Sequence, residues 1–90
     1  MKTYKFLISG KVQGVWYRKF VSENAKKRGF KGYVKNLPDG RVEAVANIEN
    51  EKRLKEFIEI LKEGSPFSRV EDIKIEEISN IEFDDFEIRY

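Results

Sequence analysis

The sequence predicts an α+β sandwich in which two helices cover one face of an antiparallel sheet. Three observations support this prediction. Apolar residues alternate with period two in several short runs, they repeat with a helical period in two longer runs, and these runs follow one another in the order β-α-β-β-α-β. With 90 residues, the chain is expected to form a single domain over residues 1–90, with little room for a linker.

The first strand is predicted over residues 3–9. Tyr4, Phe6 and Ile8 alternate there with mostly polar neighbours, which is the pattern of a strand with one buried face. Leu7 is apolar on the opposite face, and this favours a central position in the sheet.

A helix is predicted over residues 18–28. Three basic residues occupy its last turn and Gly29 follows, which is typical of a helix C-terminus. Its apolar residues recur at the spacing of one helix face: Tyr17, Phe20, Val21 and Ala25.

A hairpin is predicted next. Its first strand covers residues 30–36 and contains Gly32, which indicates a bulge or the close approach of another backbone. The sequence Leu37-Pro38-Asp39-Gly40 is a strong turn signal, because proline presets the first corner and Asp-Gly suits the later positions. Every second residue from 42 to 48 is apolar, so residues 41–48 are expected to form the returning strand.

The second helix is predicted between Asn50, a suitable N-cap, and Gly64. A fourth strand is expected over residues 70–78 and a short C-terminal strand over residues 86–90. This order is that of the ferredoxin-like split-βαβ fold (βαββαβ), with one strand added. Right-handed crossovers place the third strand beside the first, so the loop after the first strand should lie near the end of the second.

Two absences limit the chemistry of any active site. The chain contains no cysteine, so it has no disulfide, thiolate metal site or thiol nucleophile. It also contains no histidine, which is the commonest general base and the commonest metal ligand. An enzyme with this sequence must use carboxylates, amides, hydroxyls, arginine, lysine or the substrate itself.

The charge balance argues against a nucleic-acid-binding domain, and the short apolar runs argue against a membrane-spanning protein. A net charge of +2, from 18 basic and 16 acidic residues, is too small for a typical nucleic-acid-binding domain. No run approaches the ~20 apolar residues of a membrane helix. The apolar part of residues 1–10 is too short for a signal peptide, and we therefore expect a cytoplasmic protein.

The stretch from Gly10 to Arg18 follows the first strand and leads into the first helix. Its glycines, Gly10 and Gly14, allow a tight turn and a close approach of a ligand to backbone N–H groups. A helix N-terminus favours anions, and the arginine adds a charged fork suited to phosphate or carboxylate. These residues support either an anion site or an ordinary turn with a surface arginine.

The same stretch, Gly-Lys-Val-Gln-Gly-Val-Trp-Tyr-Arg over residues 10–18, resembles the phosphate-binding loop of the acylphosphatase family, G-[RK]-V-Q-G-V-x-[FY]-R. Residues 32–42 resemble the second signature of that family, G-[WYF]-V-[KR]-N-x-x-[DK]-G-x-V. Residues 64–70 and 86–90 also fit, so the resemblance covers nearly the whole chain in register.

The resemblance implies hydrolysis of the carboxyl–phosphate bond of small acyl phosphates, without a metal, a cofactor or a phosphoenzyme. Carried over by position, Arg18 binds the phosphoryl group and Asn36 orients the attacking water. The backbone N–H groups from about Gln13 to Arg18 line the phosphate site, which makes these the expected substrate-binding residues: Gln13, Gly14, Val15, Trp16 and Tyr17. We expect the Tyr17 side chain to pack in the core and Trp16 to be partly exposed at the mouth of the site.

Two positions depart from the family pattern. Ile48 stands where the family usually has glycine, which should alter the turn into the second helix, at the end away from the site. Lys11 replaces the commoner arginine and keeps the charge without the bidentate fork.

The alternative function is a non-catalytic anion- or ligand-binding module on the same fold. An RNA-binding sheet is disfavoured because the third strand has no aromatic residue. An edge strand rich in Lys and Glu favours a monomer.

Overall fold

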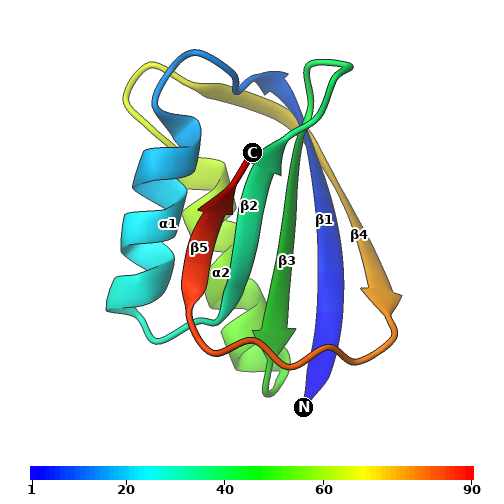
Figure 1. Cartoon of the computed structure of the whole chain (residues 1–90). Helices are drawn as coiled ribbons and strands as arrows, with labels where there is room; N and C mark the ends of the chain where they lie inside the picture. The colour runs from blue at the N-terminus through cyan, green and yellow to red at the C-terminus, as the bar shows by residue number, and fades with distance from the viewer.

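The computed structural model describes all residues, 1–90, and contains two helices and five strands (Figure 1). The elements are β1 (Lys2–Lys11), α1 (Tyr17–Lys27), β2 (Gly32–Asn36), β3 (Val42–Ile48), α2 (Glu51–Glu63), β4 (Arg69–Ile78) and β5 (Phe86–Arg89). The strand order is β4-β1-β3-β2-β5, and both helices cover the same face of the sheet. The predicted ferredoxin-like α+β fold is therefore confirmed. Neither helix combines the length and apolar character needed to cross a membrane.

The pairing of the strands agrees with the prediction except at one edge. β1 lies between β4 and β3, and the pairs β1–β3, β1–β4 and β2–β3 are antiparallel. β5 pairs with β2 in parallel, so the complete sheet is mixed rather than wholly antiparallel. The reason is visible in Figure 1: the chain leaves β4 and crosses below the sheet to the β2 edge, so β5 starts at the same end as β2.

Aromatic side chains join the helices to the sheet. Phe57 of α2 is fully buried, and its ring centroid lies 4.9 Å from that of Phe6, 5.1 Å from Phe30 and 5.9 Å from Phe86. Burying one phenylalanine contributes roughly 1.5–3 kcal/mol. One cluster of 17 buried apolar residues thus holds α2, the β1–β3 centre and the β5 edge together.

Residues near the ends of the helices and strands determine where most of these elements begin or end. Asn50 caps α2, because its side-chain oxygen accepts a hydrogen bond from the Arg53 N–H at 2.9 Å. Gly29, which follows the C-cap residue Arg28 of α1, has a φ of 78°, and the Phe30 N–H donates to the Ala25 carbonyl at 2.9 Å. Phe30 therefore belongs to the helix end, and β2 begins at Gly32, two residues later than predicted.

The turn between β3 and α2 lies at the opposite end of the molecule from the loop between β1 and α1 (Figure 1). Ile48, which replaces the usual glycine of the family pattern, is the last residue of β3 and is only 3% exposed. Its side chain joins the core, and the departure lies away from the predicted site.

Candidate active site

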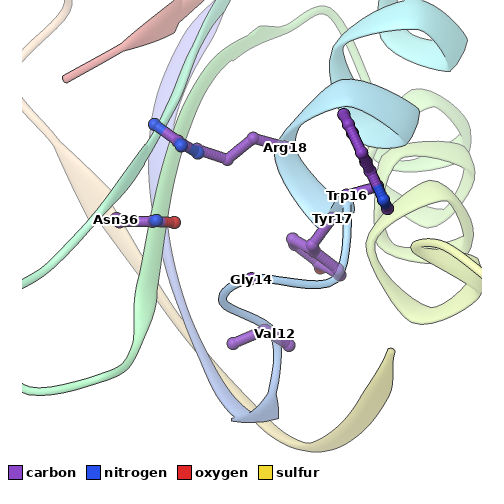
Figure 2. Close-up of a pocket in the computed structure, with 6 residues that line it drawn as sticks. All are labelled: Val12, Gly14, Trp16, Tyr17, Arg18 and Asn36. Atoms are coloured by element: carbon purple, nitrogen blue, oxygen red, sulfur yellow. The ribbon is translucent and has the colours of Figure 1, made fainter. Parts of the chain in front are cut away.

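One pocket forms where the loop after β1, the start of α1 and the end of β2 meet (Figure 2). It has a volume of about 290 Å³ and is lined by Val12, Gly14, Trp16, Tyr17, Arg18 and Asn36. The chain order predicted that Arg18 and Asn36 would lie together, although a whole helix separates them in sequence. Both residues line this pocket.

The backbone of the loop turns through two left-handed residues. Gly14 has a φ of 71° and Trp16 a φ of 65°. Glycine adopts this conformation without cost, whereas it is unfavourable for a residue with a bulky side chain. Trp16 is also the N-cap of α1, and its side chain makes no capping hydrogen bond.

The backbone amides of this segment have no hydrogen-bond acceptor within the protein. No N–H group from Gln13 to Lys19 donates to a carbonyl or to a side chain, and the first donor of the helix is Phe20, whose N–H reaches the Trp16 carbonyl at 3.1 Å. The first turn of α1 also contains no acidic residue. An uncapped helix start with free N–H groups carries partial positive charge and favours an anion.

Arg18 extends from the first turn of α1 toward Asn36 (Figure 2). Its guanidinium donates to the Arg89 carbonyl at 3.3 Å and lies 4.8 Å from the ring centroid of Tyr90. No carboxylate side chain pairs with it. The last two residues of the chain therefore hold the guanidinium while most of its donors remain free for a ligand.

Asn36 is the last residue of β2. Its side-chain oxygen is buried and has no hydrogen-bond donor. Buried polar atoms almost always have a partner, and an exception at a pocket indicates a site for water or a ligand. This atom is the only buried side-chain nitrogen or oxygen of the protein without a partner.

Gln13 does not line the pocket. Its side-chain amide donates two hydrogen bonds of 2.8 Å, to the Leu37 and Arg41 carbonyls. These carbonyls belong to the turn between β2 and β3, directly after Asn36. Both N–H donors of the side chain thus link the loop to the hairpin, while the backbone N–H of Gln13 has no acceptor within the protein.

Val15 and Tyr17 support the loop from the side of α2. Val15 is buried, and its carbonyl accepts a hydrogen bond from the Ser65 hydroxyl. Tyr17 is 1% exposed, as predicted for a core residue, and its hydroxyl donates to the Leu61 carbonyl at 2.7 Å. Burial raises the pKa of Tyr17 above its ordinary value, so this hydroxyl remains a neutral donor near neutral pH.

Trp16 is 64% exposed, in agreement with the expected position at the mouth of the site. Its indole lies on the other side of the first helical turn from the Arg18 guanidinium (Figure 2). The Lys19 ammonium lies 5.6 Å from the ring centroid. The backbone of Trp16 therefore faces the site more directly than its side chain does.

Sequence reasoning missed three parts of this arrangement: Val12 in the lining, the contact of Tyr90 with Arg18, and Ser65 beneath the loop. Val12 and Ser65 both lie in stretches that match the family pattern, which was the available signal.

No pocket residue is a carboxylate. The nearby Asp39 binds Arg41, whose hydrogen bonds hold the pKa of the Asp39 carboxyl below its usual value.

Known proteins are similar to this chain in both sequence and fold. A sequence profile of the acylphosphatase family matches residues 4–88. The acylphosphatase of Methanocella arvoryzae is 44% identical over 89 residues, which cover 99% of this chain and 100% of that protein. The crystal structure of acylphosphatase from Bacillus subtilis matches with a TM-score of 0.90 and 45% identity over 100% of both chains. An acylphosphatase structure from Coxiella burnetii matches with a TM-score of 0.87 and 36% identity, over 98% of this chain and 92% of that one. The resemblance inferred from the sequence signatures is confirmed, and the chain belongs to the acylphosphatase family.

Proposed function

We propose that this protein is an acylphosphatase, which hydrolyses the carboxyl–phosphate bond of small acyl phosphates. The products are a carboxylate and inorganic phosphate. The observation that carries the proposal is the convergence on one pocket of free backbone amides, an arginine without a carboxylate partner and a buried oxygen without a donor. These three features meet two of the three needs of the reaction, and the substrate itself meets the third.

The first need is to hold the phosphoryl group and stabilise its charge. The Arg18 guanidinium makes charge-assisted hydrogen bonds to the phosphoryl oxygens, and the amides from Gln13 to Arg18 meet the remaining oxygens. All these donors are positioned before the substrate arrives, so little reorganisation is required as charge shifts in the transition state. One such donor is typically worth about 100- to 1000-fold in kcat.

The second need is a water molecule in line with the bond that breaks. The free oxygen of Asn36 accepts a hydrogen bond from this water and directs a lone pair of the water toward phosphorus. An amide keeps this role over a wide pH range because it does not titrate.

The third need is an acceptor for the proton of the water. No pocket residue is a carboxylate, and the sequence contains no histidine. A phosphoryl oxygen of the substrate takes the proton as the new O–P bond forms. The bond between phosphorus and the carboxyl oxygen then breaks, and the carboxylate leaves with the electron pair. The chemistry needs no metal or cofactor, because the carboxylate is already a good leaving group.

The alternative is a binding module that holds an anion without turnover. The retained pair of Arg18 and Asn36 favours the enzyme, since simple anion binding does not require an oxygen acceptor in the pocket.

We further propose that residues 1–90 act as one monomeric domain in the cytoplasm. The free edge of β4 carries many charged residues, which disfavours pairing of two edges. The apolar run near the N-terminus forms the interior strand β1.

The test is hydrolysis of benzoyl phosphate by the wild type, by Arg18→Ala and by the control Arg69→Ala, with and without EDTA. Arg69 also lies at this end of the sheet, but its side chain is well exposed and pairs with Glu71. We expect kcat/KM to fall at least ~1000-fold in Arg18→Ala and to stay near wild type in the control and in EDTA. Circular dichroism should show an intact fold in both variants. Near-normal turnover by Arg18→Ala contradicts the assignment, and phosphate binding without hydrolysis by the wild type supports the alternative.

A further inference from the structure

Ser65 is a buried hydroxyl that the proposed reaction does not use. It lies in the loop between α2 and β4, is 4% exposed, and donates to the Val15 carbonyl. No other donor reaches this carbonyl. The backbone of Ser65 is itself held by Ser68, whose hydroxyl accepts from the Ser65 N–H at 3.0 Å and donates to the Ser65 carbonyl at 2.9 Å. Ser68 thus fixes the turn from which the Ser65 hydroxyl reaches the loop of residues 12–16 between β1 and α1, which we call the phosphate loop.

The hydrogen bond determines the orientation of one peptide unit. In a trans peptide, the C=O and N–H groups point in opposite directions. Because the Val15 carbonyl points toward the α2–β4 loop, the Trp16 N–H points away from it. In Figure 2, the yellow-green chain after α2 lies on one side of the phosphate loop, and Arg18 and Asn36 lie on the other. The Trp16 N–H thus faces the pocket side, where it has no acceptor.

The backbone of Trp16 opposes this orientation. Its φ of 65° lies in the left-handed region, which is unfavourable for a residue with a side chain. A half-turn of the peptide between Val15 and Trp16 would return Trp16 to a negative φ. It would also turn the Val15 carbonyl oxygen toward the pocket, where it would repel a phosphoryl oxygen. The hydrogen bond from Ser65 is the visible interaction that holds the peptide against this turn.

We propose that Ser65 is a positioning residue of the phosphate site. Its hydroxyl holds the peptide between Val15 and Trp16 in the orientation that presents the Trp16 N–H to the phosphoryl group. The inference rests on the proposed function, and it adds the loop between α2 and β4 to the parts of the chain that support the site.

The test measures the binding of inorganic phosphate directly. Trp16 is the only tryptophan, so its fluorescence reports phosphate binding without interference from another indole. In Ser65→Ala, the Kd for phosphate and the KM for benzoyl phosphate should both rise about tenfold, because one amide no longer faces the ligand. Ser22→Ala is the matched control. It removes a similarly buried hydroxyl, 5% exposed, that donates to the Lys19 carbonyl at 3.0 Å and touches neither Ser65 nor Val15, so phosphate affinity should stay within about twofold of wild type.

Two further measurements separate positioning from a loss of structure. In NMR spectra of ¹⁵N-labelled protein, phosphate should shift the Trp16 amide of the wild type and of Ser22→Ala, but not that of Ser65→Ala. In a Trp16→Gly background, where a positive φ has no steric cost, Ser65→Ala should weaken phosphate inhibition by less than about threefold. Ser65→Cys fills a similar space with a weak donor and replaces the alanine variant if that variant does not fold.

The outcomes distinguish this inference from the proposed function. A wild-type protein that binds phosphate but does not hydrolyse benzoyl phosphate contradicts the function, while weaker phosphate binding by Ser65→Ala still supports the role of Ser65. A Ser65→Ala variant with wild-type phosphate affinity and a normal shift of the Trp16 amide overturns the role of Ser65, whatever the activity. An equal loss of affinity in the wild-type and Trp16→Gly backgrounds overturns the role of the left-handed conformation.

Discussion

Two asparagines lie at opposite ends of the sheet, Asn36 as the last residue of β2 and Asn47 near the end of β3. The Asn47 side chain donates to the Thr3 hydroxyl at 3.0 Å and to the Ile81 carbonyl at 2.6 Å, and it accepts from the Phe83 N–H at 3.1 Å. Asn47 thereby holds the loop between β4 and β5 against the sheet. The buried oxygen of Asn36 has no partner. The same side chain stabilises the fold at one end and remains available for a ligand at the other.

The starts of the two helices differ in the same way. At α2, Asn50 caps the Arg53 N–H and Glu51 places a negative charge in the first turn. At α1, the N-cap is a left-handed Trp16 without a capping hydrogen bond, and the first turn has no acidic residue. Unsatisfied polar groups cost stability, so their concentration at one end of the molecule supports the proposed substrate site there.

Within this comparison of the two ends of the molecule, the largest effect is expected from Asn36→Ala. If this side chain orients the water, kcat should fall about 100- to 1000-fold, while phosphate affinity stays within about twofold. The free energy of unfolding should stay constant or rise slightly, because a buried acceptor without a partner is removed. Steady-state kinetics, inhibition by phosphate and urea denaturation measure the three quantities. A large loss of phosphate affinity with an unchanged kcat would show that Asn36 binds substrate instead.

Asn47→Ala is the matched variant at the other end and should give the opposite result. Three hydrogen bonds are lost, each worth about 1 kcal/mol, so the free energy of unfolding should fall by about 2–3 kcal/mol. At 25 °C, kcat and KM should remain near wild type, because the network lies far from the pocket. A lower kcat of Asn47→Ala with an unchanged free energy of unfolding would contradict the different roles of the two asparagines.

The helix starts provide a smaller test. Asn50→Ala should lower the free energy of unfolding by about 1 kcal/mol through the loss of the cap on α2. At α1, Trp16→Gly and Trp16→Ala both remove the indole and differ only in the β-carbon. The glycine variant should be more stable than the alanine variant by about 1 kcal/mol, because φ is 65° at this position. Equal stability of the two Trp16 variants would argue against strain in the phosphate loop.

The smallest effect concerns the open face of the sheet, away from both helix starts. Burial, together with the hydrogen bond and charge of Glu43, raises the pKa of Tyr33 to about 12. The neutral phenol is therefore favoured by folding, and its contribution is complete below pH ~10, the ordinary value for tyrosine, and is lost as the pH rises toward 12. The free energy of unfolding should fall over this range, and less steeply in Tyr33→Phe. Urea denaturation at several alkaline pH values measures the difference, and identical slopes would contradict it.

Much of the fold was predictable because its determinants are local. The alternation in residues 3–9 and the helical spacing after Tyr17 determine which face of each element is apolar, and Gly29, Asn50 and the turn at residues 37–40 determine where elements end. The β2 start at Gly32 was missed, since Phe30 is apolar in either context. The parallel pairing of β5 was also missed, because it depends on the path of the loop from β4.

The candidate site likewise has features that follow from the sequence and features that depend on the tertiary structure. By itself, the sequence determined that Arg18 follows a glycine loop at a helix start, that Asn36 ends a strand, and that a fold of this order brings the two together. Only the tertiary structure decided which groups near them are satisfied: the amide of Gln13 turned to the hairpin carbonyls, the left-handed Trp16, the Val15 carbonyl bound by Ser65 and the buried oxygen of Asn36 left free. Hydrogen bonds such as the one from Ser65 to Val15 join groups 50 residues apart. Their geometry depends on how whole elements pack, and no local pattern of residues encodes it.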